Sequence, residues 1–430
     1  MRIIEEKKFF STIQKSVTLS LLQQNYSHPP NPMNPNQLTL PKLVESISGP
    51  AAAFRCRTEL QPAGGVGDKV FPPTYSGAVY AIEQRQIFDA EGKNPQTKTC
   101  VVLDSVQAQA NRMEDALQAA LDVGRVKVPV LSVDFTGLGL LDEVGRVTSL
   151  EAPHRVADAI LRDSLHDGQP FRKSDLGKQL DAASLQNATP LYQLCPTALV
   201  FGIWDSTGPK GGLGAKFQRS LVSEIIGVNA QIGKKTSSRI DPLGMRAAAK
   251  VIKKDGSYEL AGDKAAGAVS PSEVNHGNIP PDVTDGGATI DYAEQTIVLS
   301  LPALRRLRFP VDGKTTVERD NAGRTVLVAL ALTAAALAAE SGFDLRSRCL
   351  LWPTGPLTWE LLATPGKPTE KLTITSEDAI SLLREAVAAA EKEGLKWQSE
   401  PITLKPAPNL IALLKRSQEI SAATPETSAS

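Results

Sequence analysis

The order of apolar and polar positions predicts alternating strands and helices along most of the chain. Ala51–Leu60 (AAAFRCRTEL) is expected to form a strand that ends in a glycine-rich loop. Ser105–Leu121 is predicted to be a helix, because its apolar residues recur on one face, namely Val106, Ala110, Met113 and Leu117. Val126–Phe135 alternates like a strand, and Pro129 favours a sheet edge because proline cannot donate to the ladder.

The centre of the chain holds a continuous apolar run, Thr197–Trp204 (TALVFGIW). Such a run is typical of a strand that is buried on both faces. Phe217–Ile226 is predicted to be a helix that ends at Gly227, and another helix is expected to begin over His154–Leu161. The remaining predicted elements are the strands Thr296–Leu301 and Ser347–Trp352, the helix Arg324–Glu340, and a helix from Thr375 or Ser376 to Gly394.

These elements mix without a strict strand–helix–strand period, which favours an α+β fold over a doubly wound sheet. Residues 1–40 are expected to be a disordered extension, because 22–40 is rich in Asn, Gln and Pro. The folded domain is expected to span 41–418, with a mobile insertion near 261–287 that is rich in Gly, Pro, Asp and Asn. Residues 419–430 are predicted to be a frayed tail.

Composition narrows the class of protein. The 430 residues carry 47 basic and 47 acidic side chains with 41% hydrophobic content, as expected of a soluble globular protein. Zero net charge excludes a globally basic nucleic-acid binder, but it leaves room for a local basic patch.

The cysteines, the histidines and the most apolar stretch indicate a cytoplasmic protein without cofactors. Four widely spaced cysteines form no CxxC pair, so buried thiols in a reducing cytoplasm are expected, and neither they nor the four histidines show metal-ligand spacing. The most apolar stretch, Val326–Ala339, is shorter than the roughly 20 residues that span a membrane, so a buried helix is expected and no membrane partner.

Positive charge gathers in one segment, Gly202–Lys254. It holds 10 basic and 3 acidic residues, an excess of seven on a neutral chain. Phosphate contacts need such a concentration of charge. The basic residues are Lys210, Lys216, Arg219, Lys234, Lys235, Arg239, Arg246, Lys250, Lys253 and Lys254.

The layout of this segment predicts a phosphate cradle. A predicted strand ends at Trp204, a loop with Gly208, Gly211, Gly212 and Gly214 follows, and a helix is expected to begin near Lys216. Glycines let backbone N–H groups approach an anion, and a helix N-terminus adds partial positive charge. The segment fails the P-loop and Rossmann patterns, and its two GxxG matches are a weak signal. A flexible connector with solvated lysines remains the alternative.

Other candidates have competing interpretations. Trp204 is compatible with stacking on a base, although a core position at the end of a buried strand is favoured. Asp205 is compatible with a nucleophile or a metal-binding carboxylate, but a turn residue is commoner. The charged residues on 154–163 are expected to form internal ion pairs. Arg305, Arg306 and Arg308 are expected to lie in a solvated turn. The role of Lys69 is ambiguous.

Several long motifs resemble a known family. The main one is ALVFGIWDSTGPKGGLGAKFQRSLVSEIIG followed by KKTSSRIDPLG, joined by LQPAGGVGDKVFPPTY, VLDSVQAQANRMEDAL, HRVADAILRDS and SGFDLRSRCLLWP. Over roughly residues 50–360 the chain resembles the backbone RAMP subunit (Cas-seven type, GSU-type RAMP family) of the type I-G (formerly I-U) CRISPR Cascade effector complex. The stacking-aromatic signature of RRM domains is not in the sequence, so base stacking on the face of a sheet is not expected.

The resemblance implies a modified RRM-like (ferredoxin-like) core with large insertions, one of them a thumb-like element near 261–287. It implies a non-catalytic subunit that polymerises with its copies along a CRISPR RNA and presents the guide for pairing with target DNA. Other Cascade subunits would be its further partners, and a RAMP endoribonuclease using Asp205 or His154 is the alternative. The RNA-binding residues implied are Gly208, Lys210, Gly211, Gly212, Gly214, Lys216, Arg219, Lys234, Lys235 and Arg239.

Overall fold

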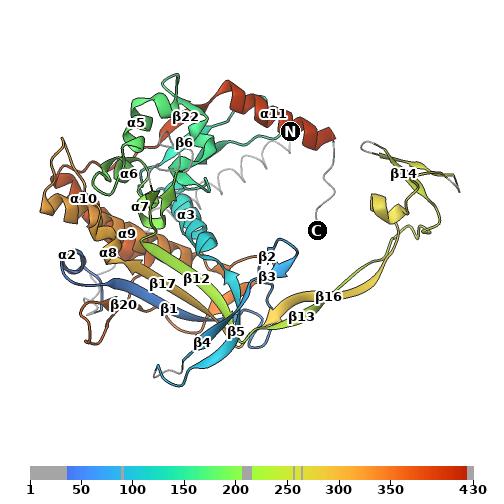
Figure 1. Ribbon diagram of the computed structural model, residues 1–430, viewed down its shortest axis with the longest axis horizontal. Helices are drawn as coiled ribbons and strands as arrows, with labels where there is room; N and C mark the ends of the chain where they lie inside the picture. The colour runs from blue at the N-terminus through green and yellow to red at the C-terminus, as the bar shows by residue number, and fades with distance from the viewer. Residues whose placement is uncertain (1–35, 89–91, 206–215, 255–256, 263–264, 424–430) are drawn as a thin grey trace, which may run out of the picture. The chain divides into compact units, whose positions relative to one another are not determined.

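The computed structural model describes residues 36–88, 92–205, 216–254, 257–262 and 265–423 (Figure 1). Helices and antiparallel sheets share the compact unit Leu38–Ser430. The predicted α+β class is therefore confirmed.

A nine-stranded sheet forms the centre of this unit, and all its strand pairs are antiparallel. Along β1, residues Phe54, Cys56 and Leu60 are buried while Arg57 and Glu59 are exposed, so one face of the sheet meets the core. In spatial order its strands are β18 (Phe343–Asp344), β19 (Leu350–Pro353), β1 (Ala53–Pro62), β17 (Tyr292–Ser300), β12 (Leu221–Val228), β5 (Gln96–Asp104) and β4 (Ile82–Ile87), with β20 (Trp359–Leu362) beside β1 and β21 (Glu370–Leu372) beside β20.

Helices α3 and α9 cover the core face of the sheet (Figure 1). Ala110, Met113 and Leu117 of α3 are buried, which confirms the predicted apolar face. Helix α9 is buried nearly all round and packs against α10, α3 and α2. The helices on this side are α2 (Leu40–Ser48), α3 (Val106–Asp122), α8 (Leu301–Arg305), α9 (Val317–Glu340) and α10 (Ser376–Lys392).

Two of these helices confirm predictions made from local sequence. Helix α9 includes the predicted buried stretch and begins earlier, at Val317, where the side chain of Thr316 accepts from the backbone N–H of Arg319. Among the described residues α9 alone is long and apolar enough to cross a membrane, and 83% of its most apolar window is buried in the protein. Helix α10 begins at the predicted Thr375 cap, where Thr375 and Asp378 form a capping box.

A five-stranded sheet lies beside α11 and the short helices of the middle of the chain. Its strand β6 pairs with both β7 and β22, so the predicted edge position is wrong, and Pro129 precedes the strand instead of lying in it. The order is β7 (Arg146–Thr148), β6 (Leu131–Asp134), β22 (Ile402–Pro406), β8 (Ser164–His166) and β9 (Gln169–Pro170). The helices are α4 (Ala159–Arg162), α5 (Asp175–Asp181), α6 (Thr189–Leu194), α7 (Thr197–Phe201) and α11 (Pro408–Ala423), with 3-10 turns η1 (Arg155–Ala157) and η2 (Phe171–Lys173).

Two central elements have the opposite type to the one predicted. Thr197–Trp204 was predicted as a strand, but it forms helix α7 and then the two-residue strand β10 (Ile203–Trp204). Phe217–Ile226 was predicted as a helix, but it belongs to β11 (Lys216–Phe217) and β12. The loop between β10 and β11 is therefore followed by a strand, and the predicted helix N-terminus behind a phosphate cradle is wrong.

A long two-stranded hairpin, the arm, joins β12 to β17. It consists of β13 (Gln231–Arg239) and β16 (Ile279–Thr289), which pair from Gln231 opposite Thr289 out to Arg239 opposite Ile279 (Figure 1). Beyond Arg239 come the hairpin of β14 (Val251–Lys254) and β15 (Ser257–Leu260) and the 3-10 turn η3 (Pro271–Val274). Part of the insertion predicted near 261–287 is thus the strand β16, and the inserted hairpin begins earlier in the chain, at β13.

The two ends of the described chain test part of the predicted domain boundaries. Helix α2 begins at Leu40 and Leu38 is buried, while residues 1–35 lie outside the described part. Helix α11 continues to Ala423, into the segment predicted to be a frayed tail, and 424–430 lie outside the described residues. A small hairpin of β2 (Thr74–Tyr75) and β3 (Val79–Tyr80) completes the described elements.

Candidate nucleic-acid interface

A groove of about 1140 Å³ lies where the first turns of α3 meet β10, β11 and the segment 153–162. The loop predicted to bind phosphate joins β10 to β11, so both of its anchoring strands line this groove. A volume above the usual range of small-molecule pockets, about 300–1,000 Å³, suits a polymeric ligand better than a compact metabolite.

One wall of the groove carries an exposed aromatic side chain. Trp204 is 62% exposed, which makes the favoured interpretation of a core tryptophan wrong. Its neighbour Phe201 is buried as predicted. The register of β10 and β11 places Lys216 directly opposite Trp204, and the Lys216 ammonium lies 5.5 Å from the centre of the indole ring. A base that stacks on this ring would therefore have a cation beside it.

Three exposed cations of the groove have no carboxylate partner. Lys216, Arg219 and Arg306 form no ion pair with any described residue, and all three line the groove. Arg306 follows α8, so the chain brings it to the other two from a distant part of the sequence. Their charge is available to an anionic ligand.

Other groove cations are neutralised by the protein. Arg155 is buried and donates to both carboxylate oxygens of Glu114, each at 2.7 Å, and Arg162 pairs with Asp163. Burial raises the pKa of Glu114 to about 7, against the lowering effect of Arg155. The preference for internal ion pairs in this stretch is confirmed, with Glu114 as the partner of Arg155. These two arginines shape the groove without adding net charge.

The backbone beside Trp204 is held in place by a glycine. Gly202 has φ 82°, and a Cβ there would lie 3.0 Å from the carbonyl oxygen of Phe217 and from the backbone N of Arg219. Its carbonyl accepts from Nη1 of Arg155 at 3.1 Å. Only glycine fits where α7 turns into β10 and passes this close to β11 and the residues after it.

Asp205, on the other side of Trp204, is buried and pairs with Arg172, which also pairs with Asp181. This pairing anchors the end of β10. Within the described ranges no group of three His, Cys, Asp or Glu side chains is arranged to hold a metal ion. The four cysteines are free, and their burial confirms the prediction of buried thiols.

The predicted RNA-binding residues fall into three places. Gly208, Lys210, Gly211, Gly212 and Gly214 lie outside the described residues. Lys216 and Arg219 line the groove. Lys234, Lys235 and Arg239 lie on β13 of the arm, where Lys234 pairs with Asp285 on β16. The structure thus divides a set that is continuous in sequence.

Sequence reasoning placed little weight on two groove residues. Arg306 was predicted to lie in a solvated turn, and Trp204 in the core. A signal for Trp204 was present, because polar residues follow it at once and an exposed end of a strand fits that pattern. Nothing in the local sequence indicates that Arg306 reaches the same groove.

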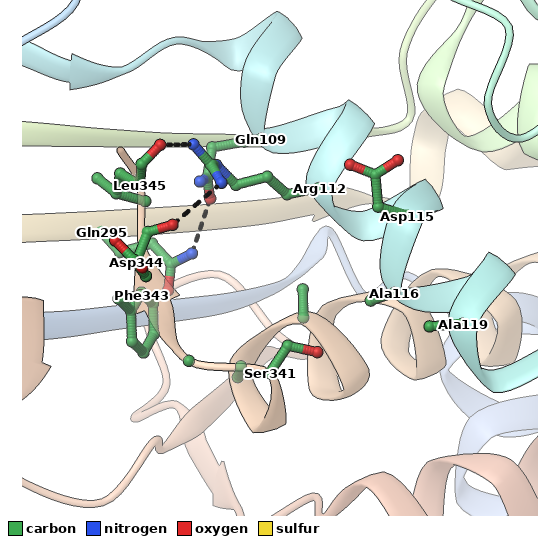
Figure 2. Close-up of a pocket in the computed structure, with 13 residues that line it drawn as sticks. Gln109, Arg112, Asp115, Ala116, Ala119, Gln295, Ser341, Phe343, Asp344 and Leu345 are labelled. Atoms are coloured by element: carbon green, nitrogen blue, oxygen red, sulfur yellow. Dashed lines mark hydrogen bonds between the residues drawn. The ribbon is translucent and has the colours of Figure 1, made fainter. Parts of the chain in front are cut away.

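A smaller cavity of about 240 Å³ lies between α3 and the end of α9 (Figure 2). Figure 2 shows Arg112 of α3 pointing toward the carbonyl oxygen of Leu345, and Gln109 paired with Gln295 of β17. Arg112 also donates to the fully buried Asp104 at 2.9 Å. These hydrogen bonds join α3 to the sheet, while the buried Oε1 of Gln295 accepts no hydrogen bond from the described residues.

Comparison with known families adds an independent result. Residues 54–232 match the sequence model of a family described as CRISPR-associated protein GSU0053 (Cas_GSU0053). Over this range the chain is similar to CRISPR-associated proteins. The range runs from β1 to the start of β13 and holds most of the groove, although it is less than half of the 430-residue chain. It supports a RAMP-type CRISPR protein with a role in CRISPR defence. No curated protein matches the chain.

Proposed function

We propose that this protein binds CRISPR RNA in the groove beside Trp204 and is a backbone subunit of a type I Cascade surveillance complex, of subtype I-G. Copies of the chain would polymerise along the guide in the cytoplasm, contact other Cascade subunits, and present the guide for pairing with target DNA. The family match supports the CRISPR setting. The side chains of the groove support RNA as the ligand.

One observation favours single-stranded nucleic acid as the ligand. An exposed indole with a lysine over its ring lies in a groove that also holds two unpaired arginines. Single-stranded nucleic acid is bound by this combination, because bases stack on aromatic rings and cations meet the backbone. A stacked base needs no sequence-specific contact, as is required of a subunit that accepts any guide.

The strand order supports an RRM-like core. Taking β1, β12, β17 and β19 as the four strands in chain order, their order in the sheet is fourth, first, third, second. Helix α3 lies between the first and second in the chain, and α9 between the third and fourth. This order matches the β-α-β-β-α-β arrangement of ferredoxin-like folds and supports such a core, with β4, β5, the arm and the segment between α3 and β12 as insertions.

The outer face of this sheet is poorly suited to stacking bases. It carries ion pairs between strands, such as Arg57 with Glu294 at 2.6 Å and Arg55 with Glu360 at 2.7 Å. Carboxylates repel phosphate, so we assign RNA to the groove and not to this face. This agrees with the missing RRM aromatic signature.

The binding test compares two lysines of equal charge. Lys216→Ala should lower affinity for single-stranded RNA and flatten the log–log salt slope by about 0.7, the value for one phosphate contact. Lys367→Ala, at an exposed turn that is not part of the groove lining, should change neither. Fluorescence anisotropy at several salt concentrations measures both quantities. Equal behaviour of the two variants would refute the groove as the RNA site.

Co-purification provides a test in the native setting. Protein purified from cells that express a CRISPR array should carry RNA, seen as a raised 260/280 nm absorbance ratio that RNase treatment lowers. Lys216→Ala with Arg219→Ala should carry less. Protein that is free of nucleic acid in such cells contradicts the proposed function.

A RAMP endoribonuclease is the second candidate, and one observation favours it. His154 is exposed in the same groove as Lys216 and Arg219, where an imidazole could serve as a general base beside a bound phosphate. Asp205 is less suited, because it is buried and paired with Arg172. Our proposal is a non-catalytic protein, so labelled RNA should stay intact with and without divalent metal. Cleavage that is lost in His154→Ala would establish the alternative.

A further inference from the structure

A second group of cations gathers where the arm leaves the sheet. We call Lys69, Phe71, Lys235 and Arg348 the arm-base cluster. They come from three separate parts of the chain: the segment after β1, strand β13, and the segment between β18 and β19. Lys235 and Arg348 are exposed, and Lys69 and Phe71 are half-buried.

Arg348 is held in an unusual conformation. Its φ is 60°, in the left-handed region that side-chain-bearing residues seldom adopt. Its carbonyl accepts from the N–H of Phe71 at 3.0 Å, and its guanidinium carbon lies 4.1 Å from the centre of the Phe71 ring. A guanidinium placed over a ring keeps its N–H edge directed away from the ring, so it is ordered before any ligand arrives.

Lys69 lies beside the same ring, and Lys69 and Lys235 both pack against the glycines of β16. The Lys69 ammonium lies 5.9 Å from the Phe71 ring centre and donates to the carbonyl of Lys234 at 2.6 Å. Gly287 has φ 74°, and a Cβ there would lie 2.7 Å from Cδ of Lys69, while a Cβ at Gly286 would meet Lys235. The paired glycines thus let both lysine stems pack against the arm.

The charge balance of the arm-base cluster is positive. Lys69, Lys235 and Arg348 form no ion pair with any described carboxylate. The nearby acids are Asp68, whose carboxylate accepts from the N–H of Lys69, and Asp285, which pairs with Lys234.

We infer that the arm-base cluster is a second anion site, which binds a phosphate of a nucleic-acid backbone with Arg348 as its pre-ordered ligand. The inference rests on the proposed function, since the same RNA strand is the expected ligand. The groove meets β12 at Val222, and the arm starts after β12 ends at Val228. Six residues at about 3.3 Å each place Val228 roughly 20 Å from Val222, so only a longer strand can reach both sites.

The test therefore varies the RNA length. Arg348→Gln removes the charge at an exposed position, and glutamine has to adopt the same left-handed backbone conformation as the arginine that it replaces. It should weaken binding of an RNA of about 30 nucleotides roughly tenfold and flatten its salt slope by about 0.7. Binding of the trinucleotide UUU should stay unchanged. Trp204→Ala should weaken binding of both RNAs.

Matched variants make each outcome decisive. Arg416→Gln removes one exposed arginine from α11 and should leave both affinities unchanged. Arg348→Lys keeps the charge without the planar guanidinium and should recover part of the loss. If Arg348→Gln equals wild type on the long RNA while Trp204→Ala is weakened, the second site is wrong and the groove stands. If Arg348→Gln weakens UUU equally, there is no separate second site. If wild type binds neither RNA, both proposals fail.

Discussion

The sharpest prediction concerns Trp204. The side chain is 62% exposed and its ring lies under the Lys216 ammonium, so it makes few contacts that the fold needs. Trp204→Ala should therefore change the free energy of unfolding by no more than about 0.5 kcal/mol, the usual range for exposed positions. If the proposal is right, the same change removes a stacking surface for RNA.

The magnitude follows from the contact that is lost. Stacking of one base on one aromatic side chain contributes about 1–3 kcal/mol by alanine substitution. At about 1.4 kcal/mol per tenfold change, the dissociation constant should rise roughly 5- to 150-fold. The salt slope should remain that of wild type, because stacking releases no counterions. Weaker binding with an unchanged slope separates this variant from Lys216→Ala.

The assay pairs Trp204→Ala with Trp352→Ala. Trp352 lies on β19, is 71% exposed and is not among the groove residues, so it controls for the loss of an exposed indole. Anisotropy of labelled RNA gives the affinity, and thermal unfolding gives the stability of each variant. An affinity loss below about twofold for Trp204→Ala, or equal losses for both variants, would refute the stacking argument.

Further outcomes follow from other contacts. Glu114→Gln leaves the buried Arg155 unpaired and should destabilise the protein by about 3–5 kcal/mol, measured by urea unfolding. Gly202→Ala should lower the melting temperature and weaken RNA binding together, since its Cβ would lie 3.0 Å from backbone atoms of β11 and Arg219. The thiols should react with maleimide only on unfolding, and early labelling would contradict the buried positions of Cys56, Cys100, Cys195 and Cys349.

Elements whose signals are local were predictable from the sequence. Helix α3 repeats apolar residues at helical spacing, and α10 begins at the Thr375 capping residue, so each carries its own determinants. Both predictions are confirmed. The buried helix α9 was predicted from its apolar composition alone, because nearly every side of it meets other elements.

Two elements were predicted with the wrong type, because their local sequence does not distinguish a helix from a strand. Thr197–Trp204 is apolar throughout, and such a run fits a strand buried on both faces as well as a helix turn buried all round. In Leu221–Val228 the buried Leu221, Ser223 and Ile225 alternate with Val222 and Glu224, a period of two that was hidden because Ser223 is polar. Ser223 is buried because it donates to Gln109 of α3, a contact that the sequence cannot show.

A charge count over Gly202–Lys254 indicates that the stretch is basic, but it does not indicate which of its cations can bind an anion. The excess of seven includes the groove residues Lys216 and Arg219, but a count treats every cation alike. Distant carboxylates decide which charges stay available: Asp285 pairs with Lys234, whereas Lys216 lies over an indole and pairs with no described carboxylate. Arg306, outside the stretch, joins the groove because α8 ends beside it. An anion site therefore depends less on how many cations a segment holds than on which of them the fold leaves unpaired at one place.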